Sequence, residues 1–183
     1  MEINRNLIEI LTFFFENPYE ELHLRAISKR TKISIFSVKK SVDTLVSLNL
    51  LKERRVGKMR YIKANVDNLF FKYLKIAFNL KKILDSGINE YLAETIPGLF
   101  SIVLFGSVAK GEDDENSDLD LLIIGQRTRR IDLKKFEKKI GKEIKPIIMK
   151  WSEWKKEAKR NRAFYLEVIT TGICLYGNLP VVE

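Results

Sequence analysis

The most constraining feature of this sequence is a Gly-Ser pair followed, after ten intervening residues, by Asp-Leu-Asp, with apolar segments around both. The segments 100–105 and 118–124 each predict a buried strand, because short apolar runs bounded by turn residues are typical of strands covered on both faces. Gly106 and Ser107 form the turn after the first strand, and residues 108–111 are expected in a short helix. This region should therefore fold as strand, turn, short helix, loop and strand.

Asp118 and Asp120 should share one face of the second strand, because side chains alternate along a strand, while Leu119 and Leu121 enter the core. Two neighbouring carboxylates repel each other, and a divalent cation relieves that repulsion. Magnesium prefers oxygen ligands and leaves positions open for phosphate oxygens, so this pair predicts a site for Mg²⁺, or Mn²⁺, with a nucleoside triphosphate (NTP). Gly106 lets the backbone approach the triphosphate, and Ser107 offers a hydroxyl and an N–H at a helix start.

The pattern Gly-Ser-x10-Asp-x-Asp resembles the signature of minimal nucleotidyltransferases of the DNA polymerase beta superfamily, and the resemblance covers residues 85–178. It implies that Gly106 and Ser107 bind the β and γ phosphates and that Asp118 and Asp120 hold the metal. It also implies a reaction in which an acceptor hydroxyl attacks the α phosphate, so that a nucleoside monophosphate is transferred and pyrophosphate is released.

Enzymes of this family carry a third carboxylate on a later strand. This sequence departs from the family at that position. That strand is expected over 143–149 (EIKPIIM), following a helix with Leu133, Phe136 and Ile140. Lys145 falls where the third acid belongs, and Glu143 lies one strand period earlier. We expect both side chains to face the aspartate pair, and Glu143 to be the acid on which catalysis depends. The acidic run 112–115 is interpreted as a solvated loop.

The stretch 152–171 predicts a single helix, and Trp151 and Trp154 are expected in the core. Residues 127–160 carry 14 Lys and Arg against 5 Asp and Glu. These basic side chains either bind a nucleic-acid acceptor or lie on a helix face that is exposed to water.

The first third of the chain predicts helices with a basic hairpin. Apolar residues at helical spacing (Ile3, Leu7, Ile8, Leu11, Phe14) predict an opening helix that Pro18 ends. A short helix over 24–30 and a tight turn lead to Ser34, which caps a helix that should bury Ile35, Val38, Val42, Leu45 and Val46. The opposite face is expected to expose Ser37, Lys40, Ser41 and Thr44. Residues 51–63 predict a β-hairpin that turns at Gly57 and Lys58.

This order of elements resembles the winged helix-turn-helix domain over residues 1–65. The resemblance implies that duplex DNA is the partner, with the capped helix in the major groove. It further implies that four hairpin residues, Arg54, Arg55, Lys58 and Arg60, contact phosphates or a minor groove. The alternative is that these charges solvate the wing while the domain packs on a protein partner.

The charge distribution favours two domains with different tasks. The net charge is +9, residues 1–66 carry 13 bases against 7 acids, and residues 112–120 hold six carboxylates. We predict an α+β protein with a winged helix-turn-helix domain over 1–66, connecting helices over 67–97, and an α/β nucleotidyltransferase-like domain with a small mixed sheet over 98–183. An apolar stripe on the connecting helix (Leu69, Phe70, Tyr73, Ala77, Leu80, Leu84) either connects the domains or forms a homodimer contact.

The single cysteine, Cys174, excludes a disulfide framework, and the lack of a leader or membrane span predicts a cytoplasmic protein. Abundant Lys, Glu and Ile with one Gln are typical of heat-loving organisms.

Three functions remain open. The first is an enzyme that transfers a nucleoside monophosphate to a hydroxyl on a protein, an RNA or a small molecule. The second is a DNA-binding transcriptional regulator whose degenerate nucleotidyltransferase domain only senses a nucleotide. The third is an antitoxin-like component of a toxin–antitoxin pair, with a separate protein as its target.

Overall fold

The structure is a computed structural model that describes residues 5–126 and 131–182. The chain divides into two compact units, Met1–Lys75 and Ile76–Glu183, called here the first and the second unit. The boundary falls within a helix, α4 (Leu69–Ser86), so part of the predicted connecting segment belongs to the second unit. Ile3, which was expected in the opening helix, lies outside the described residues.

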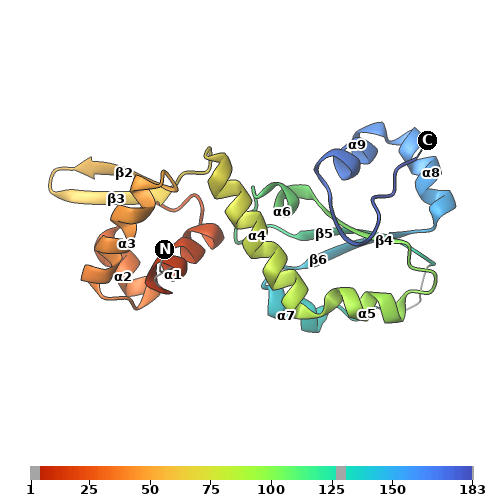
Figure 1. Ribbon diagram of the computed structural model, residues 1–183, viewed down its shortest axis with the longest axis horizontal. Helices are drawn as coiled ribbons and strands as arrows, with labels where there is room; N and C mark the ends of the chain where they lie inside the picture. Colours follow the sequence, from red (N-terminus) through yellow and green to blue (C-terminus); the bar gives the residue numbers. More distant parts are fainter. Residues whose placement is uncertain (1–4, 127–130, 183) are drawn as a thin grey trace. The chain divides into compact units, whose positions relative to one another are not determined.

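The first unit combines helices, among them the start of α4, with a small antiparallel sheet (Figure 1). Its elements are α1 (Arg5–Glu16), β1 (Leu22–His23), α2 (Leu24–Thr31), α3 (Ile35–Ser47), β2 (Leu51–Val56) and β3 (Met59–Ala64), with sheet order β1-β3-β2. The Nδ1 atom of His23 accepts from the N–H of Ala26 and caps α2, and Ser34 caps α3. Gly57, at φ 58°, provides the left-handed backbone of the hairpin turn.

The second unit is built on a mixed sheet of order β6-β5-β4-β7, formed by β4 (Ser101–Phe105), β5 (Leu119–Ile124), β6 (Ile144–Met149) and β7 (Ile173–Gly177). Strand β4 pairs antiparallel with β5 and β7, whereas β5 and β6 are parallel. The helices are α5 (Ile88–Thr95), α6 (Gly106–Lys110), α7 (Lys134–Ile140), α8 (Trp151–Arg160) and α9 (Arg162–Thr171), besides the second half of α4. The protein is thus of the α+β class, with small sheets.

Both faces of this sheet are covered, and the alternation along β5 separates them. Leu119, Leu121 and Ile123 share a buried cluster with residues of α4, α5 and α7. Leu122 and Ile124 share another with Trp154, Ala158, Tyr165 and Val168 of α8 and α9. Asp120 has the parity of Leu122, so its side chain lies on the side of the sheet that α8 and α9 cover.

The predicted helix over 152–171 is in fact two helices that break at Asn161. This residue leaves the helical region of backbone space (φ −120°, ψ 74°), and its side chain accepts from the N–H of Phe164 to cap α9. The tryptophan pair also separates: Trp154 is fully buried and donates to the carbonyl of Pro180, whereas Trp151 is exposed beside Phe100. Placing Trp151 in the core was therefore wrong.

The apolar stripe on α4, predicted to connect the domains or to form a homodimer contact, is exposed in four of its members, Leu69, Phe70, Tyr73 and Leu84. The helix instead buries a set of residues at a spacing of four, which includes Phe71, Asn79 and Ile83. Within the described residues, no helix combines the length and apolar character needed to cross a membrane.

Candidate functional site

The glycine and one of the two aspartates meet at the end of β4. Phe105 pairs with Asp120 across the antiparallel ladder, and α6 begins directly after it at Gly106. Gly106 has a φ of 74°, and a Cβ atom there would lie 2.4 Å from Oδ2 of Asp120. Glycine is therefore required at this position for two reasons: the backbone is left-handed, and a side chain would collide with the Asp120 carboxylate. Ser107, the next residue, is partly exposed.

The carboxyl of Asp120 is held in an unfavourable charge environment. Burial raises its pKa above the ordinary aspartate value, and the negative charges of Asp118 and Glu167 raise it further, against a smaller lowering by Lys145. Asp118, partly exposed, lies two residues away at the entrance to β5. A cation placed between these acids would remove the repulsion.

Lys145 lies on β6 directly beside Asp120, because the two residues are register partners in the parallel β5–β6 pair. Its ammonium group binds the carboxylate of Glu143, and this hydrogen bond is the main cause of a raised Lys145 pKa, to which the charge of Asp118 also contributes. Lys145 is therefore protonated at neutral pH. The position next to Asp120 on the neighbouring strand is thus cationic.

Glu143 precedes β6, and its side chain is 62% exposed and bound to Lys145. The acid whose charge reaches Asp120 from outside the Asp-x-Asp motif is instead Glu167, on α9. Its Oε1 atom lies 2.5 Å from Nζ of Lys110 at the end of α6. Sequence reasoning missed Glu167, because one glutamate in a helix distant in sequence from the motif gives no signal.

The acidic loop before Asp118 is anchored from within, which corrects its interpretation as fully solvated. Asp113 is buried, accepts from Nδ2 of Asn79 at 2.9 Å and forms an ion pair with Lys142 at 3.1 Å. Lys142 also donates to the carbonyl of Asp114 at 2.5 Å. These contacts fix the path of the chain into Asp118.

In the first unit, α3 presents a different face from the one predicted. Ser41 is only 3% exposed and lies among the side chains that α3 buries, so its assignment to a DNA-binding face was wrong. Ile35, expected in the core, is 47% exposed, and Phe36 is 77% exposed. Lys40 is exposed as predicted, whereas Ser37 and Thr44 are partly buried. The helix is rotated about its axis because Val38, Ser41, Val42 and Leu45 together form the buried stripe.

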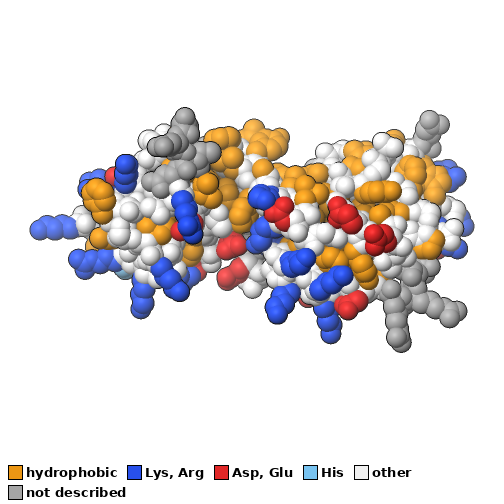
Figure 2. All heavy atoms as spheres, turned by 60° about the horizontal axis from the view of Figure 1, so that its bottom comes forward, with side chains coloured by type: hydrophobic (Ala, Val, Ile, Leu, Met, Phe, Trp, Pro, Cys, Tyr) orange, Lys and Arg blue, Asp and Glu red, His pale blue; other side chains and the backbone are white. Residues whose placement is uncertain are grey.

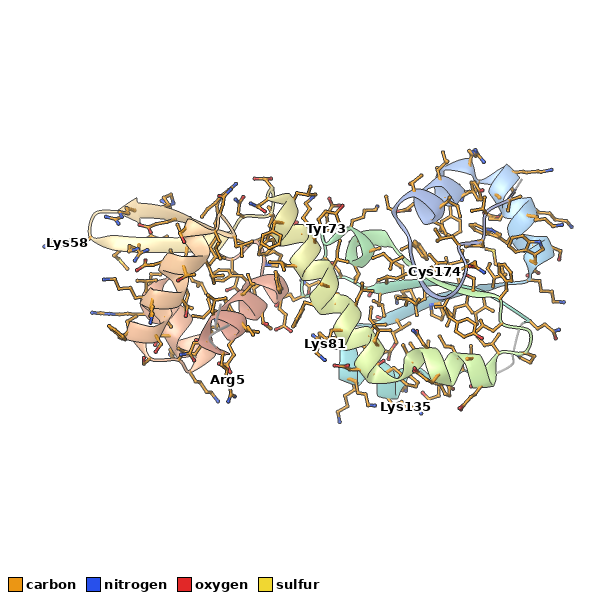
Figure 3. The ribbon with its side chains drawn as sticks, viewed as in Figure 1. Arg5, Lys58, Tyr73, Lys81, Lys135 and Cys174 are labelled. Atoms are coloured by element: carbon orange, nitrogen blue, oxygen red, sulfur yellow. The ribbon has the colours of Figure 1, made fainter. Side chains whose placement is uncertain are left out.

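The hairpin cations differ in burial and in pairing. Arg60 is 17% exposed and donates to Glu53 at 2.5 Å and to Asp43 at 2.7 Å, so it serves the fold rather than a phosphate. Arg54 is bound to Glu21 and Arg55 to Glu53, although both side chains remain exposed. Lys58, at the hairpin tip (Figure 3), has no ion pair within the described parts of the chain.

A concave region of about 520 Å³ lies between the starts of α2 and α3 and the hairpin. Its lining residues are His23, Leu24, Arg25, Ile35, Lys58, Met59 and Arg60. Figure 2 shows several Lys and Arg side chains, and few Asp or Glu, over the part of the molecule that holds α3 and the hairpin. The surface therefore combines positive charge with apolar patches.

Comparison with known proteins gives one family match. Residues 85–169 match the family model described as "Nucleotidyltransferase domain", a range that includes Gly106, Ser107, Asp118, Asp120, Lys145 and Glu167. Among solved structures, the chain resembles one titled "Crystal structure of the toxin-antitoxin with AMP-PNP", with 24% identity over 55% of this chain and 74% of that chain and a TM-score of 0.37. No curated protein matches the sequence.

Proposed function

Because residues 85–169 match a nucleotidyltransferase domain, we propose that the second unit binds a magnesium nucleoside triphosphate and transfers its nucleoside monophosphate to an acceptor hydroxyl. The single observation that carries this proposal is the meeting of Gly106 with the carboxylate of Asp120. It brings a backbone turn suited to phosphate next to acids suited to a cation.

Asp118 and Asp120 would hold the divalent cation, Mg²⁺ or Mn²⁺. The pKa of Asp120 supports this, because it is raised by burial and then by the negative charge of Asp118, and a cation between the two carboxylates would relieve that repulsion. Within the described residues, no group of three or more His, Cys, Asp or Glu is placed to hold a metal ion. The remaining ligands would thus be phosphate oxygens and water, as magnesium prefers in nucleotide sites. When bound, the cation neutralises charge on the phosphates.

Gly106 and Ser107 would bind the β and γ phosphates through the N–H groups and the hydroxyl at the start of α6. Lys145, being protonated, would neutralise the α phosphate or the departing pyrophosphate. In the reaction, the acceptor oxygen forms a bond to the α phosphorus, and the bond from that phosphorus to the bridging oxygen breaks. Pyrophosphate leaves, and the hydroxyl proton passes to a carboxylate. Glu143 and Glu167 are the two candidates for that carboxylate.

The test is incubation of the protein with magnesium, α-labelled NTPs and cell extract, followed by a search for labelled protein, RNA or small molecules. The proposal expects label from the α position and none from the γ position, since pyrophosphate carries the γ phosphate away. Asp118→Asn combined with Asp120→Asn is the matched inactive control.

The outcomes separate the competing functions. A single labelled protein would indicate an antitoxin-like role, with that protein as the target. Nucleotide binding without any transfer would reject the enzyme and favour a regulator that senses a nucleotide.

We infer that the first unit is a winged helix-turn-helix domain that binds duplex DNA. The observation that favours this second function is the exposed Lys39 and Lys40 on α3 together with Lys58 at the hairpin tip. Retention of a random-sequence duplex at low salt, lost steeply as salt rises, is expected. Retention that does not depend on salt would instead favour a protein partner for this surface.

A further inference from the structure

The outer face of α3 carries a large apolar side chain near its N-terminal end. At 77% exposed, Phe36 is the most exposed large hydrophobic residue among those the structure describes, and Ile35 beside it is 47% exposed. Both belong to the first turn of α3, directly after the Ser34 cap. This part of the helix is the one that approaches the base edges when such a helix enters a groove.

The charges around Phe36 favour a polyanion over a protein core as its partner. Lys39 and Lys40 follow it on the exposed side of α3, and Arg25 and Lys58 line the concave region next to Ile35. The acid on this side of the helix, Asp43, is occupied by Arg60 at 2.7 Å. The exposed face of α3 that carries the aromatic ring therefore also carries positive charge.

Duplex DNA offers a ring in this position only one apolar partner in the major groove. Phosphates are charged, and the base edges there carry donors and acceptors, except for the C5-methyl group of thymine. We propose that Phe36 packs against a thymine methyl group in the major groove, and so gives the first unit a preference for thymine at that position. This inference rests on the proposed binding of duplex DNA.

The experiment compares two duplexes that differ only in the methyl group. Full-length protein is titrated into a labelled duplex of alternating deoxyadenosine and thymidine, and into the same duplex with deoxyuridine in place of thymidine. The wild type should bind the thymidine duplex about four-fold more tightly for one contacted methyl, the value of burying one such group. Phe36→Ala should bind both duplexes alike, and Phe36→Leu should keep part of the preference.

A thermal melt accompanies each variant, and Phe36→Ala should melt with the wild type because the ring is exposed. If the wild type binds both duplexes equally, or Phe36→Ala keeps the preference, the thymine contact is overturned while DNA binding stands. If the wild type binds neither duplex at low salt, DNA binding itself fails. A stoichiometric complex with a cellular protein, lost in Phe36→Ala while duplex affinity is unchanged, would assign the ring to a protein and also overturn the contact.

Discussion

Charges in the hairpin of the first unit and charges around Asp118 and Asp120 in the second are arranged in opposite ways. In the hairpin, opposite charges are paired: Arg60 binds Glu53 and Asp43, and the pKa of Glu53 lies below its ordinary value mainly because Arg60 and then Arg55 donate hydrogen bonds to it. At the second site, like charges are adjacent, and the pKa of Asp120 is raised first by burial and then by the negative charges of Asp118 and Glu167.

This difference indicates two roles for charge. The paired charges of the hairpin stabilise the fold, whereas the adjacent acids of the second unit are suited to binding a cationic ligand. A paired charge is already compensated by its partner, so removing it lowers the free energy of unfolding. Acids that are only partly compensated, as Asp118 and Asp120 are by Lys145, cost the folded state free energy, and such clusters are found where a ligand supplies the missing charge. Substitutions in the two regions should therefore differ in what they change.

The largest effect is expected from Asp118→Asn combined with Asp120→Asn. The double variant should lose magnesium-dependent nucleotide binding in calorimetry, since the acids that hold the cation are gone. Its melting temperature should not fall, because the substitutions remove a repulsion. Glu115→Gln, an exposed acid of the same loop, is the control and should bind as the wild type does. Unchanged binding by the double variant would put the nucleotide elsewhere.

The next effect concerns the two remaining acids near the carboxylate pair. Glu167→Gln should lower transfer about 100-fold or more if Glu167 takes the proton, with nucleotide affinity nearly intact. Glu143→Gln should have the smaller effect, because the charge of Glu167 acts on Asp120, whereas the Glu143 side chain is 62% exposed. Single-turnover rates and calorimetry on both variants decide the matter. Loss of transfer in Glu143→Gln alone would restore Glu143 as the essential acid that the sequence suggested.

Arg60→Ala should destabilise the first unit by about 2 kcal/mol, because two hydrogen-bonded acids lose a largely buried partner. Urea unfolding of the first unit, followed by a probe placed there, would measure the change. Arg55→Ala, which removes an exposed partner of the same Glu53, should cost less than about 1 kcal/mol. If the two variants lost the same free energy of unfolding, Arg60 would contribute no more to the fold than the exposed Arg55.

The smallest effect is expected on the salt dependence of DNA binding. Lys58→Ala should reduce the slope of log K against log salt by about 1, as expected for one lost phosphate contact. Arg55→Ala should reduce it less, since Glu53 already neutralises part of that charge. Identical slopes for wild type, Arg55→Ala and Lys58→Ala would remove the hairpin from the DNA interface.

Much of the second unit could be predicted because its signals are local. The strand–turn–helix at Gly106 and the strand ending at Ile124 follow from runs and spacing within short segments. The position of Lys145 beside Asp120 came instead from the family resemblance, which implies a functional residue on that later strand. Glu167 and Asp113 were missed for the opposite reason. Their surroundings are created by chain segments distant in sequence, Lys110 for the first, and Asn79 and Lys142 for the second.

The helices of the first unit were located more accurately than their faces. A serine can be buried or exposed, so the pattern of α3 could not show that Ser41 belongs to the buried stripe and Ile35 does not. On α4, the sequence could not show which apolar residues the chain itself buries, because the buried Phe71 and Ile83 are as apolar as the exposed Phe70 and Leu84. Periodicity identifies a helix, but tertiary packing decides which of two apolar faces is covered.

The order of strands in the second sheet has a consequence for synthesis of the chain. Strand β4 is central, with β5 on one side and β7 on the other, and β7 is translated long after β5. While the nascent chain grows, β4 can pair with β5, yet its other edge remains open until β7 leaves the ribosome. An open, apolar edge of this kind invites pairing with other chains, so it is the point at which a chaperone would be most useful to this protein.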